Sequence, residues 1–315
     1  MTLAPSPFHP FERAIQARLG VSDKLGKMGA KFIRDEMPEQ HQEFFQGLAY
    51  LFAGWRDEQG RLWASVLPGS PGFVDASDPR TLNIDLATTA DDPFKKALVA
   101  NADLGFLGLD FSNRRRNRVN GHIVHADHDT LTVTVDQSFG NCPKYIQVRE
   151  MQSIHRPTPS KTGAEFTTFT ARETNLINAA DSFYIASGHK GKERAAGSGI
   201  DVSHRGGTPG FVHLTDNQTL IFPDFRGNFF FNTLGNLESD DRAGLLLIDF
   251  ATGNLLQLTG HARTRWNHDP SIHQGADRLV TFTLSAARWL DGHFYDDWSV
   301  PEPSPFLKGM GWQER

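Results

Sequence analysis

The chain has 315 residues, a formal net charge of −5, and hydrophobic residues making up 38%, which is enough for two cores. The acidic balance argues against general nucleic-acid binding, which usually leaves a basic surface. One cysteine, Cys142, excludes an intrachain disulfide and a cysteine-rich metal site. No run approaches the roughly 18 apolar residues of a membrane span, and residues 1–7 lack a signal-peptide pattern. We therefore expect a soluble cytoplasmic protein with no membrane or nucleic-acid partner.

Short helices are expected over residues 8–35, where apolar residues recur between glycine interruptions. From residue 50 onward the pattern is that of strands separated by turn signals, apart from a helix over 91–101. The strands are expected at Tyr50–Arg56, Leu62–Leu67, Thr81–Leu86, Gly105–Asp110, Arg118–His125 and Leu131–Gln137. The basic run Arg114–Arg118 falls between two of them, and we interpret it as a solvated hairpin turn rather than an anion site.

The second half of the chain has a similar pattern. Residues 151–170 contain prolines and serines that suit an interdomain linker, and Glu173–Ala180 should form a helix. Strands are expected at Phe183–Ser187, Gly199–His204, Phe211–Leu214, Thr219–Phe222, Ala243–Asp249, Leu255–Arg265 and Leu279–Ala287. Mostly antiparallel strands with one or two short helices in each half indicate small β-barrels.

The two halves repeat one another. Residues 70–74 read Ser-Pro-Gly-Phe-Val, and residues 208–212 read Thr-Pro-Gly-Phe-Val. The register then holds with one added residue, which pairs Leu104–Phe111 with Ala243–Phe250 and Gly121 with Gly260. A repeat of this length is too long for a solenoid unit and indicates a duplicated domain.

Residues 201–212 form the first cluster that suggests a ligand site. Alternation along a strand would put Ser203 and Arg205 on one face, and Gly206-Gly207 would let a ligand approach the backbone. An arginine beside glycines and hydroxyl groups is a plausible phosphate cradle, because a guanidinium offers a rigid pair of donors. The same residues would equally suit a bulge followed by a turn, and both interpretations stay open.

Residues 222–236 form the second cluster. A strand, Gly227-Asn228 and a short helical turn would present backbone N–H groups to an anion, beside Asn232, Thr233 and Asn236. The three phenylalanines at 229–231 would wall a planar ring or belong to the core. The corresponding stretch of the first copy lacks these residues. Because the copies differ where a ligand would bind, this contrast favours a site in the second copy.

These motifs resemble the pyridoxamine 5′-phosphate oxidase-like family of FMN-binding split barrels. The similarity covers roughly residues 40–300. It rests on residues 204–212, 222–228, 232–237, 242–250 and 258–263. The end of the first copy, residues 137–147, resembles the family's long two-copy branch.

The resemblance implies two tandem split β-barrels in a mainly β chain with short helices, and FMN at the seam between them. The implied parts are a helical extension over 1–39, a degenerate first barrel over 40–150, a linker over 151–172, and a flavin-binding second barrel with a C-terminal tail over 173–315. Arg205 would lie near the phosphate, Asp224 to Asn228 would border the flavin and its ribityl chain, and Gln257 would reach the ring edge. The implied cofactor-binding residues are Ser203, Arg205, Gly206, Asp224, Arg226, Asn228, Thr233, Asn236, Gln257, Asn141 and Lys144.

Three positions carry further expectations. Family members that make pyridoxal phosphate have an Arg-Lys pair where this chain has Phe229-Phe230, so we do not expect that reaction. Lys144 would pair with the flavin N1/O2 edge or with the phosphate. Cys142 is either a thiol activated by nearby Lys144 or a buried structural cysteine.

The implied function is that of an FMN-dependent oxidoreductase. A reduced nicotinamide nucleotide or a partner reductase would supply hydride or electrons for a small molecule that the sequence does not identify. The alternative is a non-enzymatic protein that stores or senses flavin or haem, with His189, His204 or His261 as an axial ligand; a deazaflavin (F420) in place of FMN is a third. No metal site is expected, and the sequence does not identify a catalytic residue. We expect one flavin per chain, and a homodimer would be an ordinary outcome.

Overall fold

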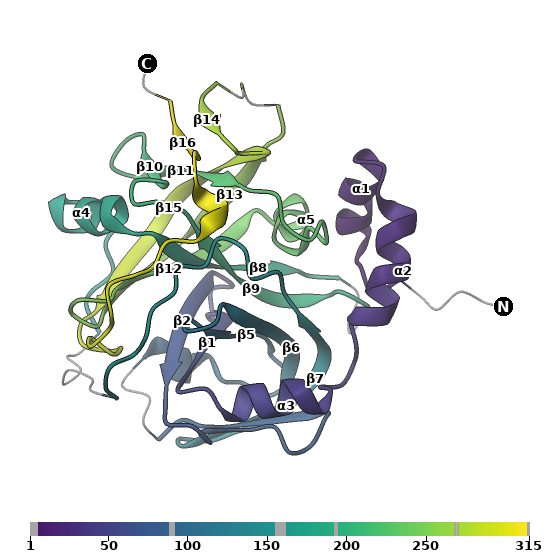
Figure 1. The fold of residues 1–315 in the computed structure, drawn as a ribbon. Helices are drawn as coiled ribbons and strands as arrows, with labels where there is room; N and C mark the ends of the chain where they lie inside the picture. The colour runs from purple at the N-terminus through teal and green to yellow at the C-terminus, as the bar shows by residue number, and fades with distance from the viewer. Residues whose placement is uncertain are drawn as a thin grey trace.

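The computed structural model describes residues 6–87, 92–154, 162–191, 195–267, 269 and 271–313. Two antiparallel sheets stand one above the other, with a pair of helices at one side (Figure 1). The helices are α1 (Pro10–Arg18), α2 (Ser22–Phe32), α3 (Glu39–Gln46), α4 (Ala171–Ala179) and α5 (Asn232–Ser239), with 3₁₀ turns η1 (Pro93–Ala97) and η2 (Pro305–Leu307). No helix in these ranges is long and apolar enough to cross a membrane.

The first sheet has seven strands in the order β2-β1-β5-β6-β7-β4-β3. Their bounds are β1 Tyr50–Arg56, β2 Leu62–Pro68, β3 Val74–Asp75, β4 Thr81–Asp85, β5 Asp103–Asp110, β6 Arg115–Ala126 and β7 Thr130–Gly140. Its core includes buried aromatic side chains such as Phe45, Trp55 and Phe106.

The second sheet repeats this arrangement in the order β10-β11-β15-β13-β12-β8-β9. Its strands are β8 Ser182–His189, β9 Gly199–Gly206, β10 His213–Leu214, β11 Thr219–Asp224, β12 Arg242–Asp249, β13 Asn254–Arg265 and β15 Arg278–Leu290. A separate pair, β14 (His273–Gln274) and β16 (Gly311–Trp312), joins the C-terminal tail to the loop before β15. The predicted fold class, a mainly β chain of two duplicated barrels, is confirmed.

Repeated glycines mark the places where the fold needs close backbone contact. A Cβ on Gly105 would lie 2.3 Å from the Ile200 carbonyl oxygen, and one on Gly244 would lie 2.6 Å from that of Leu62. These equivalent glycines let β5 and β12 of the two copies approach strands of the opposite barrel. Each copy also has a bulge at the glycine that the repeat aligned, Gly121 in β6 and Gly260 in β13.

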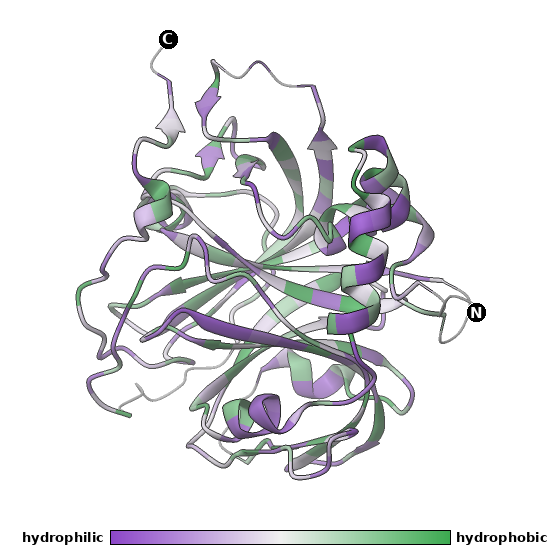
Figure 2. Cartoon of the chain, turned by 45° about the vertical axis from the view of Figure 1, so that its right-hand side comes forward, coloured by the Kyte–Doolittle hydropathy of each residue, from purple (hydrophilic) through white to green (hydrophobic). Residues whose placement is uncertain are grey.

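A third apolar core joins the two barrels. Phe52 of β1 stacks on Tyr184 of β8 with ring centroids 3.7 Å apart, and Leu107 and Leu246 are buried beside them. Hydrophobic and hydrophilic residues alternate along the strands and around α1 and α2 (Figure 2). Because this shared core is continuous, the barrels are held in one arrangement, and the space between them is defined.

Some predicted elements differ in extent. The helix expected over 91–101 is only the 3₁₀ turn η1, because Pro93 fixes its start and Asp92 caps it by accepting from the Phe94 N–H at 2.8 Å. The strand expected at Phe211–Leu214 is reduced to β10, since Phe211 donates its N–H back to the Thr208 carbonyl in a turn. Part of the predicted linker, residues 155–161, lies outside the described residues.

Candidate ligand pocket between the barrels

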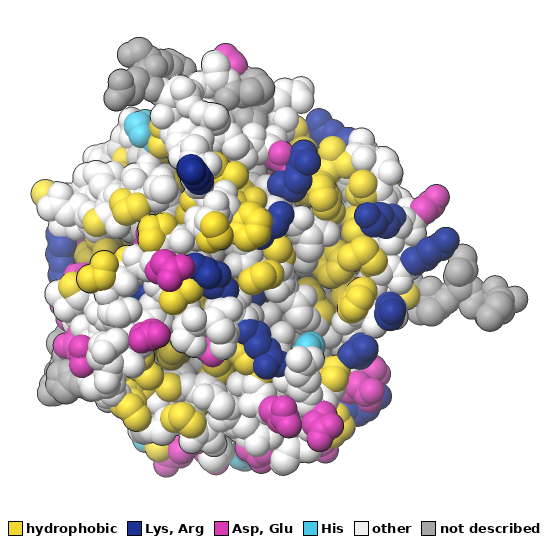
Figure 3. Space-filling model, viewed as in Figure 1, with side chains coloured by type: hydrophobic (Ala, Val, Ile, Leu, Met, Phe, Trp, Pro, Cys, Tyr) yellow, Lys and Arg dark blue, Asp and Glu magenta, His cyan; other side chains and the backbone are white. Residues whose placement is uncertain are grey.

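A pocket opens at the seam between the two barrels. Counting its open mouth, it encloses about 950 Å³ of space. Lys and Arg side chains lie among hydrophobic ones across this face of the molecule (Figure 3). Both copies contribute polar residues to the lining of the pocket. These are Arg116, Arg118, Asn141, Cys142, Lys144, Ser203, His204, Arg205, Asp224, Asn228, Asn232, Thr233, Asp277 and Arg278.

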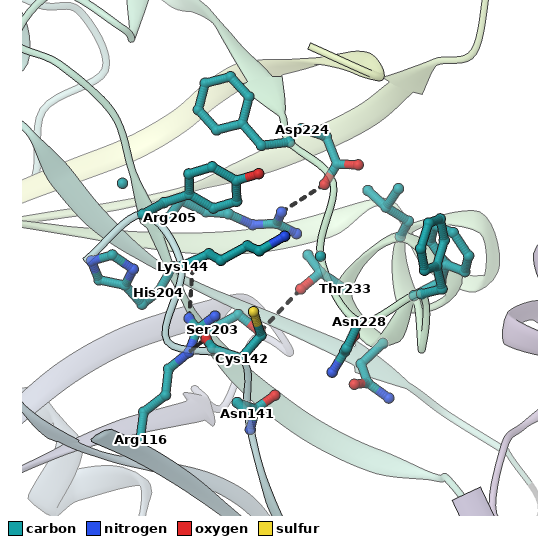
Figure 4. A pocket seen from close by; sticks show the side chains of 18 of the residues that line it. Arg116, Asn141, Cys142, Lys144, Ser203, His204, Arg205, Asp224, Asn228 and Thr233 are labelled. Atoms are coloured by element: carbon teal, nitrogen blue, oxygen red, sulfur yellow. Dashed lines mark hydrogen bonds and ion pairs between the residues drawn. The ribbon is translucent and has the colours of Figure 1, made fainter. Parts of the chain in front are cut away.

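Strand β9 supplies the central residues of the pocket. Ser203 and Arg205 both line it, as the strand alternation predicts. Arg205 donates from Nη1 to Asp224 Oδ1 at 2.6 Å, and Arg278 donates from Nη1 to Asp224 Oδ2 at 3.1 Å. Asp224 thus holds two guanidinium groups at one side of the pocket. Figure 4 shows Arg205 and Lys144 extending into the same space.

Strand β6 of the first barrel adds two arginines from the run Arg114–Arg118, for which the prediction of a solvated hairpin turn was wrong. Arg116 and Arg118 line the pocket, and Arg118 is only 3% exposed, so the run is not simply a solvated turn. Arg116 donates from Nε to the Cys142 carbonyl at 2.7 Å, and burial lowers its pKa to about 10. Their spacing in the sequence could have indicated this, because residues i and i+2 of a strand point to the same face.

Arg118 is the most connected side chain of the site. It forms an ion pair with Asp201 of β9 at 3.0 Å, and it donates to Asn232 Oδ1 at 3.0 Å and to the Ser203 hydroxyl. Asp201 also accepts from the amide of Asn120 at 2.6 Å. The buried Arg118–Asp201 ion pair and its hydrogen bonds thus connect the two barrels next to the pocket.

Glu12 of α1 lies behind Arg118 and should make stability depend on pH. Burial and the neighbouring Asp201 raise its pKa from 4.5 to about 8. In the unfolded chain the carboxyl group loses its proton near its ordinary pKa, whereas the folded protein keeps it until about pH 8. Unfolding therefore releases a proton in this range, and the free energy of unfolding should fall as pH rises.

The test is to measure the free energy of unfolding by chemical denaturation at several pH values between about 6.5 and 8, where Glu12 is expected to contribute strongly to the pH dependence. The pKa of buried His9 is lowered from 6.5 to about 4, so His9 is neutral in the folded protein and its protonation in the unfolded chain fades as pH rises above 6.5. The Glu12→Gln variant should lose this part of the pH dependence. An identical slope in wild type and variant would contradict the assignment.

The segment after β7 closes one side of the pocket. Asn141, Cys142, Lys144 and Tyr145 all line it, and the Tyr145 hydroxyl donates to the Arg226 carbonyl at 3.0 Å. A Cβ on Gly206 would lie 1.9 Å from the Tyr145 carbonyl oxygen, so glycine is required there. The first glycine of the Arg-Gly-Gly motif is therefore the point where the backbones of the two copies come into contact.

The phenylalanines of the 225–231 loop divide between pocket and core. Phe229 and Phe231 line the pocket, and both have left-handed backbones with φ of 63°. Phe230 turns away and packs against Phe8 and Phe139. Left-handed non-glycine residues are uncommon and gather at functional sites. Phe230 therefore belongs to the core, and Phe229 and Phe231 lie at the pocket.

The structure brings together eight of the predicted cofactor-binding residues. Those lining the pocket are Ser203, Arg205, Gly206, Asp224, Asn228, Thr233, Asn141 and Lys144. Arg226 is exposed beside Asp277. Asn236 is buried below, donating to Asp201 at 2.8 Å, and Gln257 donates to Ser65 of β2 at 2.8 Å. These last three residues do not reach the pocket.

The pocket has an excess of positive charge. Five cationic side chains line it: Arg116, Arg118, Lys144, Arg205 and Arg278. Asp224 and Asp277 also line it, and Asp201 neutralises Arg118, which leaves a net charge of about +2. Among the described residues, the buried Nε atoms of Arg118 and Arg205 have no hydrogen-bond partner. The excess of positive charge in the pocket points to an anionic ligand.

Of the three histidines considered as haem ligands, only His204 lines the pocket. Its buried Nε2 has no partner among the described residues, and burial together with Arg116, Arg149 and Arg205 holds its pKa well below the usual value. His189 is bonded to Ser239 and His261 to Asp241. The described part of the chain contains no group of three or more His, Cys, Asp or Glu side chains suited to a metal ion.

No protein-family profile matches the chain, and no curated protein matches its sequence. Several solved structures match parts of it at low identity. HupZ of Group A Streptococcus is 13% identical, with a TM-score of 0.31, and the match covers 40% of this chain and 98% of that one.

A protein of the pyridoxinephosphate oxidase family from Clostridium acetobutylicum is 8% identical, with a TM-score of 0.28, and the match covers 42% of this chain and 92% of the other. An FAD-binding protein from Mycobacterium smegmatis is 11% identical, with a TM-score of 0.24, and the match covers 40% and 97%. Solved structures similar to parts of this chain thus include pyridoxamine 5′-phosphate oxidase-like and FAD-binding proteins, each matching about two fifths of it.

Proposed function

We propose that this chain binds FMN in the pocket between its barrels and acts as a flavin-dependent oxidoreductase. The observation that carries the proposal is the pocket's net charge of about +2 beside aromatic rings. A phosphate monoester carries about −1.5 to −2 at pH 7, which matches that charge. Phe225, Phe229, Phe231 and Tyr145 supply apolar surface for a planar ring.

The donors of the pocket suit such a ligand. Arg205 and Lys144 would hold the phosphate, because both side chains extend into the pocket. Ser203, Thr233 and Asn228 offer neutral hydrogen bonds for a polyol chain. When bound, FMN would supply hydride or electron transfer. The side chains of the chain itself orient the ligand, limit water, and place positive charge beside it.

The pocket loop lacks the basic residues that members of the family use to make pyridoxal phosphate, and this bears on which substrate is proposed. Phe229 and Phe230 stand where members that make pyridoxal phosphate have basic residues, so the proposal does not extend to that reaction. Reducing equivalents would come from a nicotinamide nucleotide that docks transiently, or from a partner reductase. The substrate would be a small molecule.

The deciding experiment is a titration of the purified protein with FMN, followed by NADH or NADPH under nitrogen. We expect quenching of flavin fluorescence on binding and bleaching of the flavin absorbance on reduction. Failure to bind FMN would remove the proposed cofactor. Binding without reduction by either nucleotide or by a reductase would leave a flavin-storing protein instead of an enzyme.

Haem binding is the second candidate, because His204 is among the lining residues and its buried, neutral imidazole has an Nε2 with no partner among the described residues. A Soret band should then form on titration with haem and disappear in the His204→Ala variant. FMN and haem would compete for one space.

We expect one FMN per chain because the equivalent position in the other half is filled. Gln257 stands three residues before its bulge glycine, as Arg118 does in the first copy. There Gln257 donates to Ser65, Arg288 donates to Gln257 at 2.7 Å, and the Arg288 guanidinium covers the Trp63 ring at 3.8 Å. Calorimetric titration should saturate at one equivalent. Two equivalents, or flavin bound at residues 69–95, would contradict the prediction.

A further inference from the structure

The N-terminal helix α1 packs directly against α5, the helix that borders the pocket (Figure 1). Gly235 of α5 makes the contact close, because a Cβ there would lie 2.5 Å from Cγ of Glu12. Glu12 is 2% exposed, although a carboxyl group is rarely buried without a specific partner. Its partners therefore decide what it does.

Both carboxyl oxygens of Glu12 accept hydrogen bonds. Oε2 accepts from the backbone N–H of His9 at 2.8 Å, and Oε1 accepts from the side-chain amide of Asn232 at 2.5 Å. The other end of that amide, Oδ1, accepts from Nη1 of Arg118 at 3.0 Å. Glu12 thus fixes which way the Asn232 amide faces, and Asn232 in turn presents an acceptor to a pocket arginine.

The same helix also holds the pocket loop from behind. Gln16 donates to the Phe230 carbonyl at 3.2 Å, and Phe8 packs on the Phe230 ring with centroids 5.2 Å apart. Phe230 lies between the left-handed residues Phe229 and Phe231, both of which line the pocket. A strained loop keeps its shape only where its surroundings fix it, and here α1 and the segment before it provide that support.

We propose that Glu12 is a positioning residue of the ligand pocket, acting through Asn232 on Arg118. The proposal rests on the proposed function only in that FMN is the probe. Once ionised, which its raised pKa places above about pH 8, the Glu12 carboxylate is suited to this position because both of its oxygens can accept. The amide of a glutamine has one acceptor and must turn its NH₂ group toward either His9 N or Asn232 Nδ2, both of which are donors.

The test compares Glu12→Gln with Glu173→Gln, a matched control. Glu173 is also a buried glutamate near a helix start, accepting from the Thr170 N–H at 2.7 Å and from the Trp289 indole at 2.5 Å. It does not line the pocket. Measured above about pH 8, where Glu12 is ionised, Glu12→Gln should weaken FMN binding roughly 5- to 30-fold, the result of mispairing one buried donor. Glu173→Gln should leave FMN affinity unchanged while lowering stability.

Two further variants distinguish positioning from a general effect. Gly235→Ala keeps Glu12 but forces α1 away, so it should weaken FMN in the same direction. In an Asn232→Ala background, Glu12→Gln should have no additional effect, because the connection to Arg118 is already broken. Additive losses in the double variant would overturn the proposal, as would equal losses in Glu12→Gln and Glu173→Gln.

A readout without ligand separates this proposal from the proposed function. Hydrogen–deuterium exchange of residues 229–233 should become faster in Glu12→Gln and stay unchanged in Glu173→Gln. If the wild type does not bind FMN, the proposed function fails, and the exchange measurement still decides the role of Glu12. Unchanged exchange in Glu12→Gln would overturn the positioning role even if FMN binds normally.

Discussion

Replacing Arg205 with alanine should weaken FMN binding by about 2–5 kcal/mol, the usual cost of removing one partner from a buried charge pair. Arg205 lines the pocket from β9, its side chain is 19% exposed, and its Nε has no partner among the described residues. Asp224 would keep Arg278 in the variant, so the acidic side of the cluster stays paired. The loss should therefore appear in ligand affinity, measured by quenching of FMN fluorescence.

Riboflavin is the control ligand because it has the same ring system and no phosphate. Its affinity should change far less than that of FMN. Arg226→Ala is the control variant, since Arg226 is two thirds exposed, lies outside the pocket lining, and reaches Asp277 only at 3.5 Å. Equal losses of FMN and riboflavin in Arg205→Ala would show that the arginine does not contact the phosphate.

The duplication made much of the fold predictable. Gly121 and Gly260 recur because each copy needs a bulge, and Gly105 and Gly244 recur because each copy contacts the backbone of the other. Such glycines keep their spacing when surrounding side chains change. The paired seven-stranded sheets follow from that repeat.

The site was only partly predictable, because half of it depends on how the barrels pack. Ser203 and Arg205 share a strand, so alternation placed them correctly. Arg116 and Arg118 belong to the first copy, and only the contact between β6 and β9 brings them to the pocket. Their approach involves residues far apart in the chain, and no local pattern encodes it.

Buried polar residues caused the remaining differences. Asn236 and Gln257 are polar residues in motifs that suggested a ligand site, yet each forms hydrogen bonds with other buried groups. Asn236 bonds to Asp201 and Ser187, and Gln257 bonds to Ser65 and Arg288. A sequence does not distinguish an amide that binds a ligand from one that completes an internal network. Glu12 was missed for the same reason, since its partners come from α5.

Arg118→Ala should lower the free energy of unfolding by about 3–5 kcal/mol, the range for removing one partner of a buried ion pair. Arg118 is 3% exposed, and its partner Asp201 lies in the other barrel. The variant leaves Asp201 with the amides of Asn120 and Asn236 but without a countercharge. Urea denaturation followed by tryptophan fluorescence would measure the loss, and Arg80→Ala, which removes an exposed pair with Asp35, should change little.

The double variant Arg118→Met with Asp201→Asn separates charge from packing. It removes both charges and keeps much of the volume, but the asparagine that replaces Asp201 offers one acceptor oxygen to the amides of Asn120 and Asn236. The double variant should therefore regain part of the stability that Arg118→Ala loses, because no buried charge stays uncompensated. FMN binding should not return, since the pocket would still lack the arginine. If the double variant is as unstable as Arg118→Ala, the loss comes from hydrogen bonds and from packing against Phe139, whose ring the guanidinium covers at 5.2 Å, and the ion pair is not what joins the barrels.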